Sequence, residues 1–165
     1  MMTKIEVERM VDERLAKMKK QMMEELQGQI NDNPKTIWDL SIGDRAKYYY
    51  LYSNGDVAKL YFDSCYDEKS REAGSAFLTR EEAEFEAERR KIEAIMRKYS
   101  RPFKYREYNY YIKYNHDDDT LRIGSCEVIS SGEPYFESRE IARKAINEIG
   151  EDRLKKYWFR VEDDE

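Results

Sequence analysis

The chain contains few of the residues from which most catalytic and metal sites are built. Its 165 residues include one histidine, two cysteines, three prolines and seven glycines. His116 would have to serve as the base of any hydrolytic triad, and no nucleophile-elbow sequence accompanies it. A glycine-rich phosphate loop is also missing. We therefore expect a protein that is not an enzyme and that carries no cofactor.

Long apolar runs and paired cysteines are missing as well. No stretch approaches the roughly 20 apolar residues of a membrane span, and no signal-peptide segment follows Met1. Cys65 and Cys126 stand alone, without the spacing of metal ligands. We expect two free thiols, a cytoplasmic location and no contact with a membrane.

Charge of one sign is not in large excess. The sequence has 35 acidic and 30 basic residues, a net charge of -5, and 40% apolar residues. This balance fits one globular domain with an appendage and argues against wholesale non-specific binding of nucleic acid. A local basic face stays open as an alternative.

Residues 1–33 are expected to form the appendage, a coiled-coil-like amphipathic helix. Val11, Leu15, Met18 and Met22 follow the a/d spacing of a coiled coil, but the register fails at Glu25. Two interpretations carry equal weight. The stripe either packs on the chain's own domain or forms a homodimer.

Residues 36–165 are expected to form an α+β domain built on an internal repeat. Residues 74–85 align with residues 132–142, which places Phe77 on Phe136 and Thr79 on Ser138. In both copies a buried aromatic ends a short strand and a hydroxyl caps the next helix. Each copy follows a tyrosine-rich hairpin. The predicted units are ββα, at about residues 46–99 and 108–157, and they share one core.

The first unit is predicted in more detail. Trp38 is expected to be a buried anchor, and Asn54-Gly55 predicts a type I′ hairpin turn. Residues 63–75 are read as polar and turn-like. The helix over residues 79–99 has two candidate inner faces, one rich in alanine and one bulky. We expect the sheet to cover one face and another element, such as the N-terminal helix, to cover the other.

Fourteen tyrosines exceed what one small core needs, and they favour a binding surface for a partner protein. Cross-strand packing is the equally weighted alternative. His116 and the three aspartates after it are read as a solvated turn and not as a metal site. The candidate partner-binding residues are Tyr48, Tyr50, Tyr52, Tyr108, Tyr110, Tyr111, Asp117, Asp118 and Asp119.

Four stretches carry a resemblance to a known group of sequences. They are Gly43-Asp44 leading into Tyr48-Tyr49-Tyr50, residues 77–84, Tyr110-Tyr111-Ile112, and residues 149–157. From Trp38 onward the chain resembles an uncharacterised family of accessory proteins from phages, prophages and plasmids of Gram-positive bacteria. The resemblance implies a non-catalytic inhibitor in the bacterial host cell. Its partner would be a defence protein such as a CRISPR nuclease.

A second resemblance points to nucleic acid. Three short strands followed by Phe-x-Thr-x-Glu-x-Ala are similar to AP2-type and integrase amino-terminal DNA-binding modules. The first hairpin supplies only Arg45, Lys47 and Lys59 as cations, and its tip carries Asp56. Nucleic-acid binding is therefore the alternative function.

Overall fold

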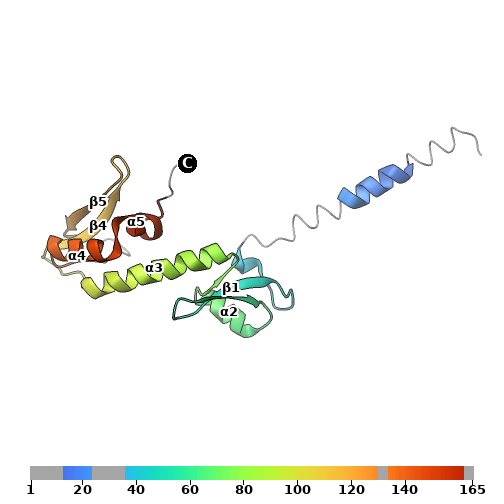
Figure 1. Ribbon diagram of the computed structural model, residues 1–165, viewed down its shortest axis with the longest axis horizontal. Helices are drawn as coiled ribbons and strands as arrows, with labels where there is room; N and C mark the ends of the chain where they lie inside the picture. Colours follow the sequence, from blue (N-terminus) through green and yellow to red (C-terminus); the bar gives the residue numbers. More distant parts are fainter. Residues whose placement is uncertain (1–12, 24–35, 130–133, 162–165) are drawn as a thin grey trace, which may run out of the picture.

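A computed structural model describes residues 13–23, 36–129 and 134–161. Two lobes are joined by one long helix, α3 (Arg80–Tyr99), as Figure 1 shows. We call residues 36–78 the first lobe and residues 101–161 the second lobe. The expected α+β class is confirmed, since each lobe combines an antiparallel hairpin with helices.

The first lobe holds a three-stranded antiparallel sheet in the order β2-β1-β3. After a 3-10 turn, η1 (Ile37–Asp39), β1 (Lys47–Leu51) pairs with β2 (Val57–Tyr61) on one side and β3 (Ala76–Phe77) on the other. The predicted hairpin is present, but its turn is not type I′. The Gly55 amide donates to the Tyr52 carbonyl over 3.0 Å, and only Gly55 has a positive φ of 92°. This geometry is a three-residue loop that closes on a left-handed glycine.

Residues 63–75 correct another prediction, because they contain a helix, α2 (Cys65–Glu72), where we expected turns. Ser64 caps it, and Asp67 at the third helical position completes a capping box. Asp67 is buried, and it also accepts a 2.5 Å hydrogen bond from the Tyr48 hydroxyl in β1. The helix is thereby fixed against one face of the sheet.

The junction of β3 and α3 follows the sequence-based prediction in its capping. The Thr79 side chain accepts a hydrogen bond from the Glu82 amide, and the Glu82 carboxylate accepts one from the Thr79 amide. The expected buried aromatic at Phe77 is wrong for this copy. Ala76 is the buried residue, at 4% exposure, and Phe77 is half-buried.

α3 buries different faces along its length. Ala83 and Ala87 are buried in the half nearer the first lobe, whereas Ile92 and Met96 are buried in the half nearer the second lobe. The prediction of one shared core is therefore wrong. The first lobe has its own cluster around Tyr48 and Phe62, and the second lobe has a larger one around Phe136 and Ile146. The second lobe covers the bulky face, and the described part of the N-terminal helix, residues 13–23, does not.

The second lobe pairs β4 (Asn109–Asn115) with β5 (Thr120–Cys126) and packs them on α4 (Arg139–Ile149). Ser138 caps α4 as predicted, by accepting from the Ile141 amide. The chain turns at Gly150, which has a φ of 93°, into α5 (Glu151–Arg153) and a π-helical turn, η2 (Leu154–Trp158). Residues 101–108 are held by Asn109, which is fully buried and whose side chain makes four hydrogen bonds.

Both lobes show the same strand arrangement, which supports the internal repeat. Phe77 pairs with Tyr49 at the edge of β1, and Phe136 pairs with Tyr110 at the same edge of β4. The N-cap of a helix follows two residues after this aromatic in each lobe. The two copies therefore share this arrangement of strand, N-cap and helix in the backbone.

The N-terminal helix is described over residues 13–23. All its side chains are exposed, with Leu15, Met18 and Met22 at 58%, 63% and 63%, and it lies apart from both lobes (Figure 1). Val11 lies outside the described residues. The described part of the stripe thus does not pack on the domain, and self-association stays a prediction. No helix within the described residues has the length and apolar character needed to cross a membrane.

Candidate functional site

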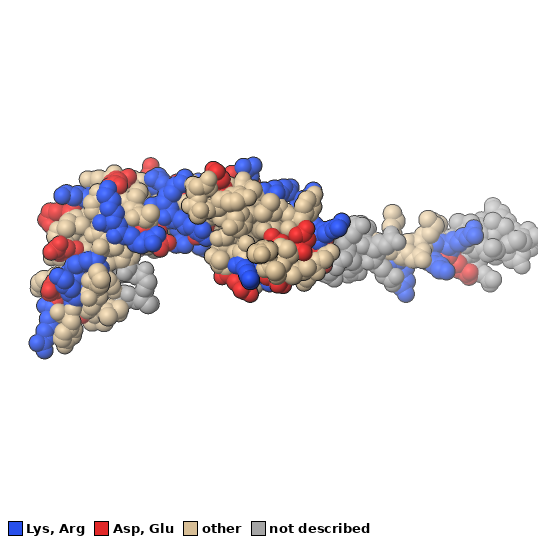
Figure 2. Space-filling view, turned by 90° about the horizontal axis from the view of Figure 1, so that it is seen from below, with Lys and Arg blue, Asp and Glu red and all other residues tan. Residues whose placement is uncertain are grey.

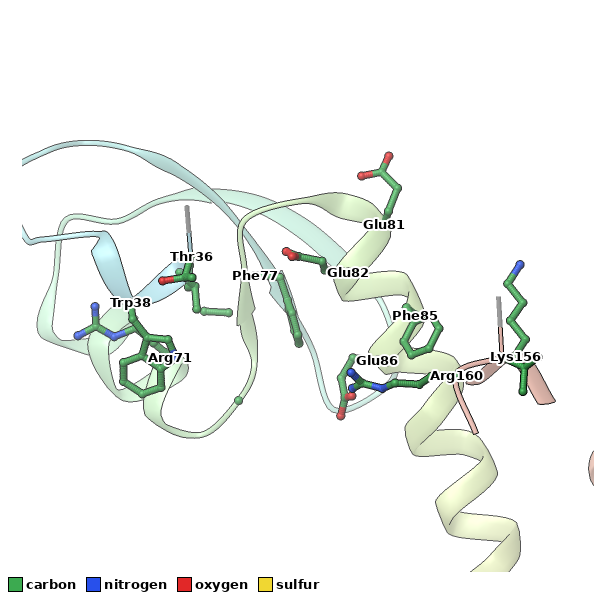
Figure 3. Close-up of a pocket in the computed structure, with 14 residues that line it drawn as sticks. Thr36, Trp38, Arg71, Phe77, Glu81, Glu82, Phe85, Glu86, Lys156 and Arg160 are labelled. Atoms are coloured by element: carbon green, nitrogen blue, oxygen red, sulfur yellow. The ribbon is translucent and has the colours of Figure 1, made fainter. Parts of the chain in front are cut away.

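A groove of about 860 Å³ runs along the free edge of β3. Its walls come from η1, the end of α2, β3, the first turns of α3 and the C-terminal segment (residues 153–161), so the groove brings together five separate parts of the chain (Figure 3). The side chains that give it character are Trp38, Arg71, Phe77, Phe85, Lys156 and Arg160. Three aromatic rings and three cations therefore lie within one hollow, together with the three glutamates Glu81, Glu82 and Glu86.

Trp38 and Arg71 form one end of the groove. The Arg71 guanidinium lies between two rings, 5.0 Å from the centre of Trp38 and 5.2 Å from the centre of Phe62. Its Nη1 donates to the Leu40 carbonyl over 2.9 Å, while its buried Nε has no hydrogen-bond partner. Trp38 is 63% exposed, so the prediction of a buried anchor is wrong. Arg71 stacks on the inner side of Trp38 and leaves the indole open to solvent.

Phe85 and the C-terminal segment form the other end. The Phe85 ring lies 5.1 Å from that of Tyr157, and the Arg160 guanidinium stands 5.7 Å from the centre of Phe85. An ion pair of 2.8 Å between Arg153 and Glu88 fixes the same segment to α3. These contacts hold Lys156 and Arg160 on the rim of the groove.

The carboxylates of the groove are largely engaged. Glu82 accepts hydrogen bonds from the amides of Leu78 and Thr79. Burial acts to raise the pKa of Glu86, but hydrogen bonds from Arg89 and Arg90 outweigh it and lower that pKa. Lys156 and Arg160, in contrast, pair with no carboxylate among the described residues. Glu81, the third glutamate of the lining, has no cationic partner among the described residues either, so the charges left without an ion pair there are two positive and one negative.

The tyrosines proposed from the sequence lie elsewhere, in two separate places. Tyr48 is buried at 1% exposure, so it cannot present a surface, and Tyr50 packs edge-on against Tyr52 at 4.7 Å. Tyr52 is 44% exposed and Tyr108 is 65% exposed. In the second lobe Tyr110 packs on the core, and Tyr111 covers Gly124 on the outer face of the sheet. Packing therefore accounts for Tyr48 and Tyr110, and Tyr52 and Tyr108 stay candidates for binding.

The aspartate turn is built from contacts within the hairpin. Asp118 accepts from Asn115, Thr120 and Arg122, and the hydrogen bond from the Thr120 hydroxyl is the main cause of its lowered pKa. Asp119 accepts from Lys155 Nζ at 2.9 Å and from Tyr114, which lower its pKa. Two of the three carboxylates thus hold the turn together and tie it to η2.

Within the described residues, no group of three or more His, Cys, Asp or Glu side chains is placed to hold a metal ion. His116 packs edge-on against Tyr114, at 4.6 Å between ring centres. The free thiols also lie apart, with Cys65 exposed at the start of α2 and Cys126 half-buried at the end of β5.

Sequence reasoning missed the groove because its residues are spread from Thr36 to Val161. No family model, curated protein or solved structure matches the chain. The resemblances drawn from the sequence therefore stay predictions, and the groove has to be interpreted from its own chemistry.

Figure 2 shows the charge on the face seen from below. Lys and Arg side chains gather over the middle of the molecule, where α3 runs, and Asp and Glu side chains lie around them. Each cation of α3 has a glutamate partner: Arg80 pairs with Glu84, Arg89 and Arg90 with Glu86, Lys91 with Glu88, Arg97 with Glu93 and Lys98 with Glu148. The positive charges of α3 are thus neutralised by neighbouring glutamates.

Proposed function

We propose that this protein acts by binding another protein and performs no chemistry of its own. The observation that carries this proposal is the groove, in which Trp38, Phe85 and two cations that pair with no described carboxylate line one continuous hollow. Tryptophan, tyrosine and arginine dominate the binding energy of protein interfaces, since they bury large areas and still form polar contacts. The partially exposed rings of the groove supply such anchors.

The partner that we propose is a host defence protein, such as a nucleic-acid-guided nuclease. This identity rests on the resemblance to the accessory proteins of phages and plasmids. An inhibitor of this type has to occupy a surface of its target and needs no catalytic group. The acidic surface as a whole would favour encounter with a basic target.

A photo-crosslinking experiment tests the proposal. The benzophenone amino acid p-benzoylphenylalanine replaces Trp38 in the groove or, as a matched control, Tyr105, an exposed aromatic of the second lobe. Bacterial cells that produce each full chain are irradiated. We expect one covalent adduct with a partner protein from position 38 and none from position 105. Equal adducts from both positions, or none, would contradict the proposal.

A cleavage assay then tests the identity of the partner. Candidate guided nucleases are mixed with increasing amounts of the full chain or of Trp38→Ala. We expect dose-dependent inhibition of cleavage by the wild type and a weaker effect of the variant. If the chain inhibits none of these nucleases and the crosslinked partner belongs to another class of protein, the partner is not a defence nuclease. The proposal that the chain binds a protein would still hold.

One observation favours nucleic-acid binding as the second candidate. On one face of the first sheet Lys47 lies 5.8 Å from the centre of Tyr61, and Lys59 lies 5.5 Å from the centre of Tyr49. Cations beside aromatic rings are typical of surfaces that bind single strands. The net charge of -5 and the paired cations of α3 speak against an extended phosphate-binding track. Steep loss of DNA or RNA binding with salt would support this candidate.

A further inference from the structure

The hydrogen-bonding pattern of the first sheet determines which way the backbone of β3 points. The Phe62 amide donates to the Ala46 carbonyl over 2.8 Å. The even-numbered residues of β1, which continue from Ala46, therefore form their backbone hydrogen bonds with β2. The Leu51 amide donates to the Ser75 carbonyl over 2.9 Å, so the odd-numbered residues of β1 form their backbone hydrogen bonds on the side of β3. Ala76 lies opposite Tyr50, an even-numbered residue. Its amide and carbonyl therefore point away from β1, into the groove.

The neighbours of Ala76 on this edge have partners. The Gly74 carbonyl accepts from Arg90 Nη2 over 2.7 Å, and the Leu78 amide donates to Glu82 Oε2 over 3.1 Å. Ala76 lies between them at 4% exposure, and its backbone groups bond to no described residue. More than nine in ten buried backbone groups in proteins have a partner. One amide and one carbonyl on the groove wall are thus left for an incoming chain.

The second lobe shows what occupies the equivalent edge there. The Phe136 amide donates to the Tyr110 carbonyl over 2.8 Å, so Tyr135 points outward as Ala76 does. The Tyr135 carbonyl accepts a 2.7 Å hydrogen bond from the Arg101 amide, in an antiparallel bridge. Aligning Phe77 with Phe136 places Ala76 on Tyr135. An extended stretch of backbone therefore covers this position in one copy of the repeat and not, among the described residues, in the other.

We infer that an extended, acidic segment of a partner protein adds to the free edge of β3, antiparallel to it, through the amide and carbonyl of Ala76. Strand addition supplies affinity through main-chain hydrogen bonds and specificity through pockets for alternate side chains. Trp38 and Phe85 would receive apolar side chains of that segment. Lys156 and Arg160, which pair with no described carboxylate, would receive its acidic ones. This inference rests on the proposed protein-binding function and specifies its mode.

The first test measures hydrogen exchange at Ala76 by NMR on the full chain. Random dodecapeptides displayed on phage are selected against the immobilised protein, and the enriched peptides are synthesised and titrated into labelled protein. We expect the Ala76 amide to exchange at least tenfold faster than the Leu51 amide in the free protein and to become protected in the complex. Enriched peptides should contain Asp or Glu beside an apolar residue.

Two exchange results would overturn the inference. A protected Ala76 amide in the free protein would mean that the chain itself or a second copy covers the edge. Bound peptides that leave the Ala76 amide unchanged would mean that the partner docks elsewhere, and the protein-binding function would then survive without strand addition. If no peptide and no crosslinked protein binds at all, the function and the inference fail together.

The second test removes the donor. In Ala76→Pro the amide hydrogen is lost, while the ladder to β1 keeps its bonds, because this amide points outward. The matched control is Lys59→Pro on β2, the opposite edge strand, whose amide also points away from β1. We expect peptide affinity to fall about tenfold or more in Ala76→Pro and to stay unchanged in Lys59→Pro. Equal peptide affinities of Ala76→Pro and Lys59→Pro would reject strand addition. If Ala76→Pro does not fold, the exchange data on the wild type decide.

Discussion

The Tyr48 hydroxyl lies 2.5 Å from Oδ1 of Asp67, and this buried hydrogen bond joins β1 to α2. Asp67 also accepts from the backbone amides of Asp63 and Ser64 and from the Ser64 hydroxyl. One carboxylate thus closes the helix cap and fixes the helix to the sheet. The stability of the first lobe should therefore depend on the ionisation of both partners.

The first prediction concerns pH. Burial acts to raise the pKa of Asp67, but its four hydrogen bonds outweigh burial and lower it. A carboxyl with a lowered pKa in the folded state stabilises the fold above its unfolded pKa of about 3.9, and this stabilisation is lost as the pH falls below that value. Burial first, and then the bond to Asp67, raise the pKa of Tyr48. The unfolded chain alone then loses this proton above about pH 10, so stability falls there too.

Urea unfolding of Tyr48→Phe between pH 3 and pH 11 checks this prediction. We expect a loss of about 1.5–3 kcal/mol at pH 7, as for hydrogen bonds to charged groups, and a smaller further loss above pH 10 than in the wild type. The control is Tyr105→Phe, a change at a side chain that is 77% exposed. An identical alkaline profile for wild type and Tyr48→Phe would contradict the assignment.

The second prediction separates the two copies of the repeat. Phe136 is fully buried in the second core, whereas Phe77 is half-buried on the wall of the groove. We expect Phe136→Ala to lower the free energy of unfolding by about 3–5 kcal/mol and Phe77→Ala to lower it by clearly less. Chemical denaturation of the two variants measures this difference. If Phe136→Ala leaves the free energy of unfolding unchanged, the assignment of Phe136 to the second core is wrong.

Interactions between residues close in the sequence explain why parts of the fold could be predicted. An N-cap needs only a hydroxyl before a helix with acidic first turns, so Thr79 and Ser138 were found from their immediate neighbours. The type I′ turn was wrong because Asn-Gly also suits a three-residue loop in which only Gly55 has a positive φ. α2 was missed because it is eight residues long and buries only Asp67, so it shows no apolar period.

The rest depends on contacts between distant residues. Nothing in the sequence of α3 states that one half would pack on the first lobe and the other on the second, because both faces are apolar enough. Its residue type predicts that Trp38 lies in the core, whereas Arg71 stacks on one side of the indole and the residue stays 63% exposed. The groove joins Thr36 to Val161, a separation that no local pattern reports.

The third prediction concerns Gly124 in β5. A β-carbon at this position would lie 2.6 Å from Cζ of Tyr111, which crosses the glycine on the outer face of the sheet. The Tyr111 ring is the far end of a flexible side chain, so it can move. We expect Gly124→Ala to cost stability only while Tyr111 is present. A double-mutant cycle with Tyr111→Ala, followed by thermal unfolding, should show coupling of about 0.5 kcal/mol or more. Additive effects would contradict direct packing.

The fourth prediction concerns the N-terminal helix, whose apolar stripe is exposed in the described residues. We expect the full chain to dimerise through this stripe, as apolar a/d positions favour. Light scattering over a concentration series should show a dimer for the wild type and a monomer for Leu15→Gln, Met18→Gln, Met22→Gln. The control exchanges the exposed polar residues Lys17→Gln and Lys19→Gln. A monomeric wild type would reject self-association.

The division of α3 between two cores has a consequence for how the molecule melts. Its 20 residues span about 30 Å, and unpacking of the first lobe would release Ala83 and Ala87 while Ile92 and Met96 stay covered. Unfolding should then proceed in two steps, with the helix fraying from its first turn inward. The chain has two tryptophans, Trp38 beside the first core and Trp158 beside the second. Each lobe thus carries its own fluorescent reporter, and a single-tryptophan variant would follow one melting step at a time.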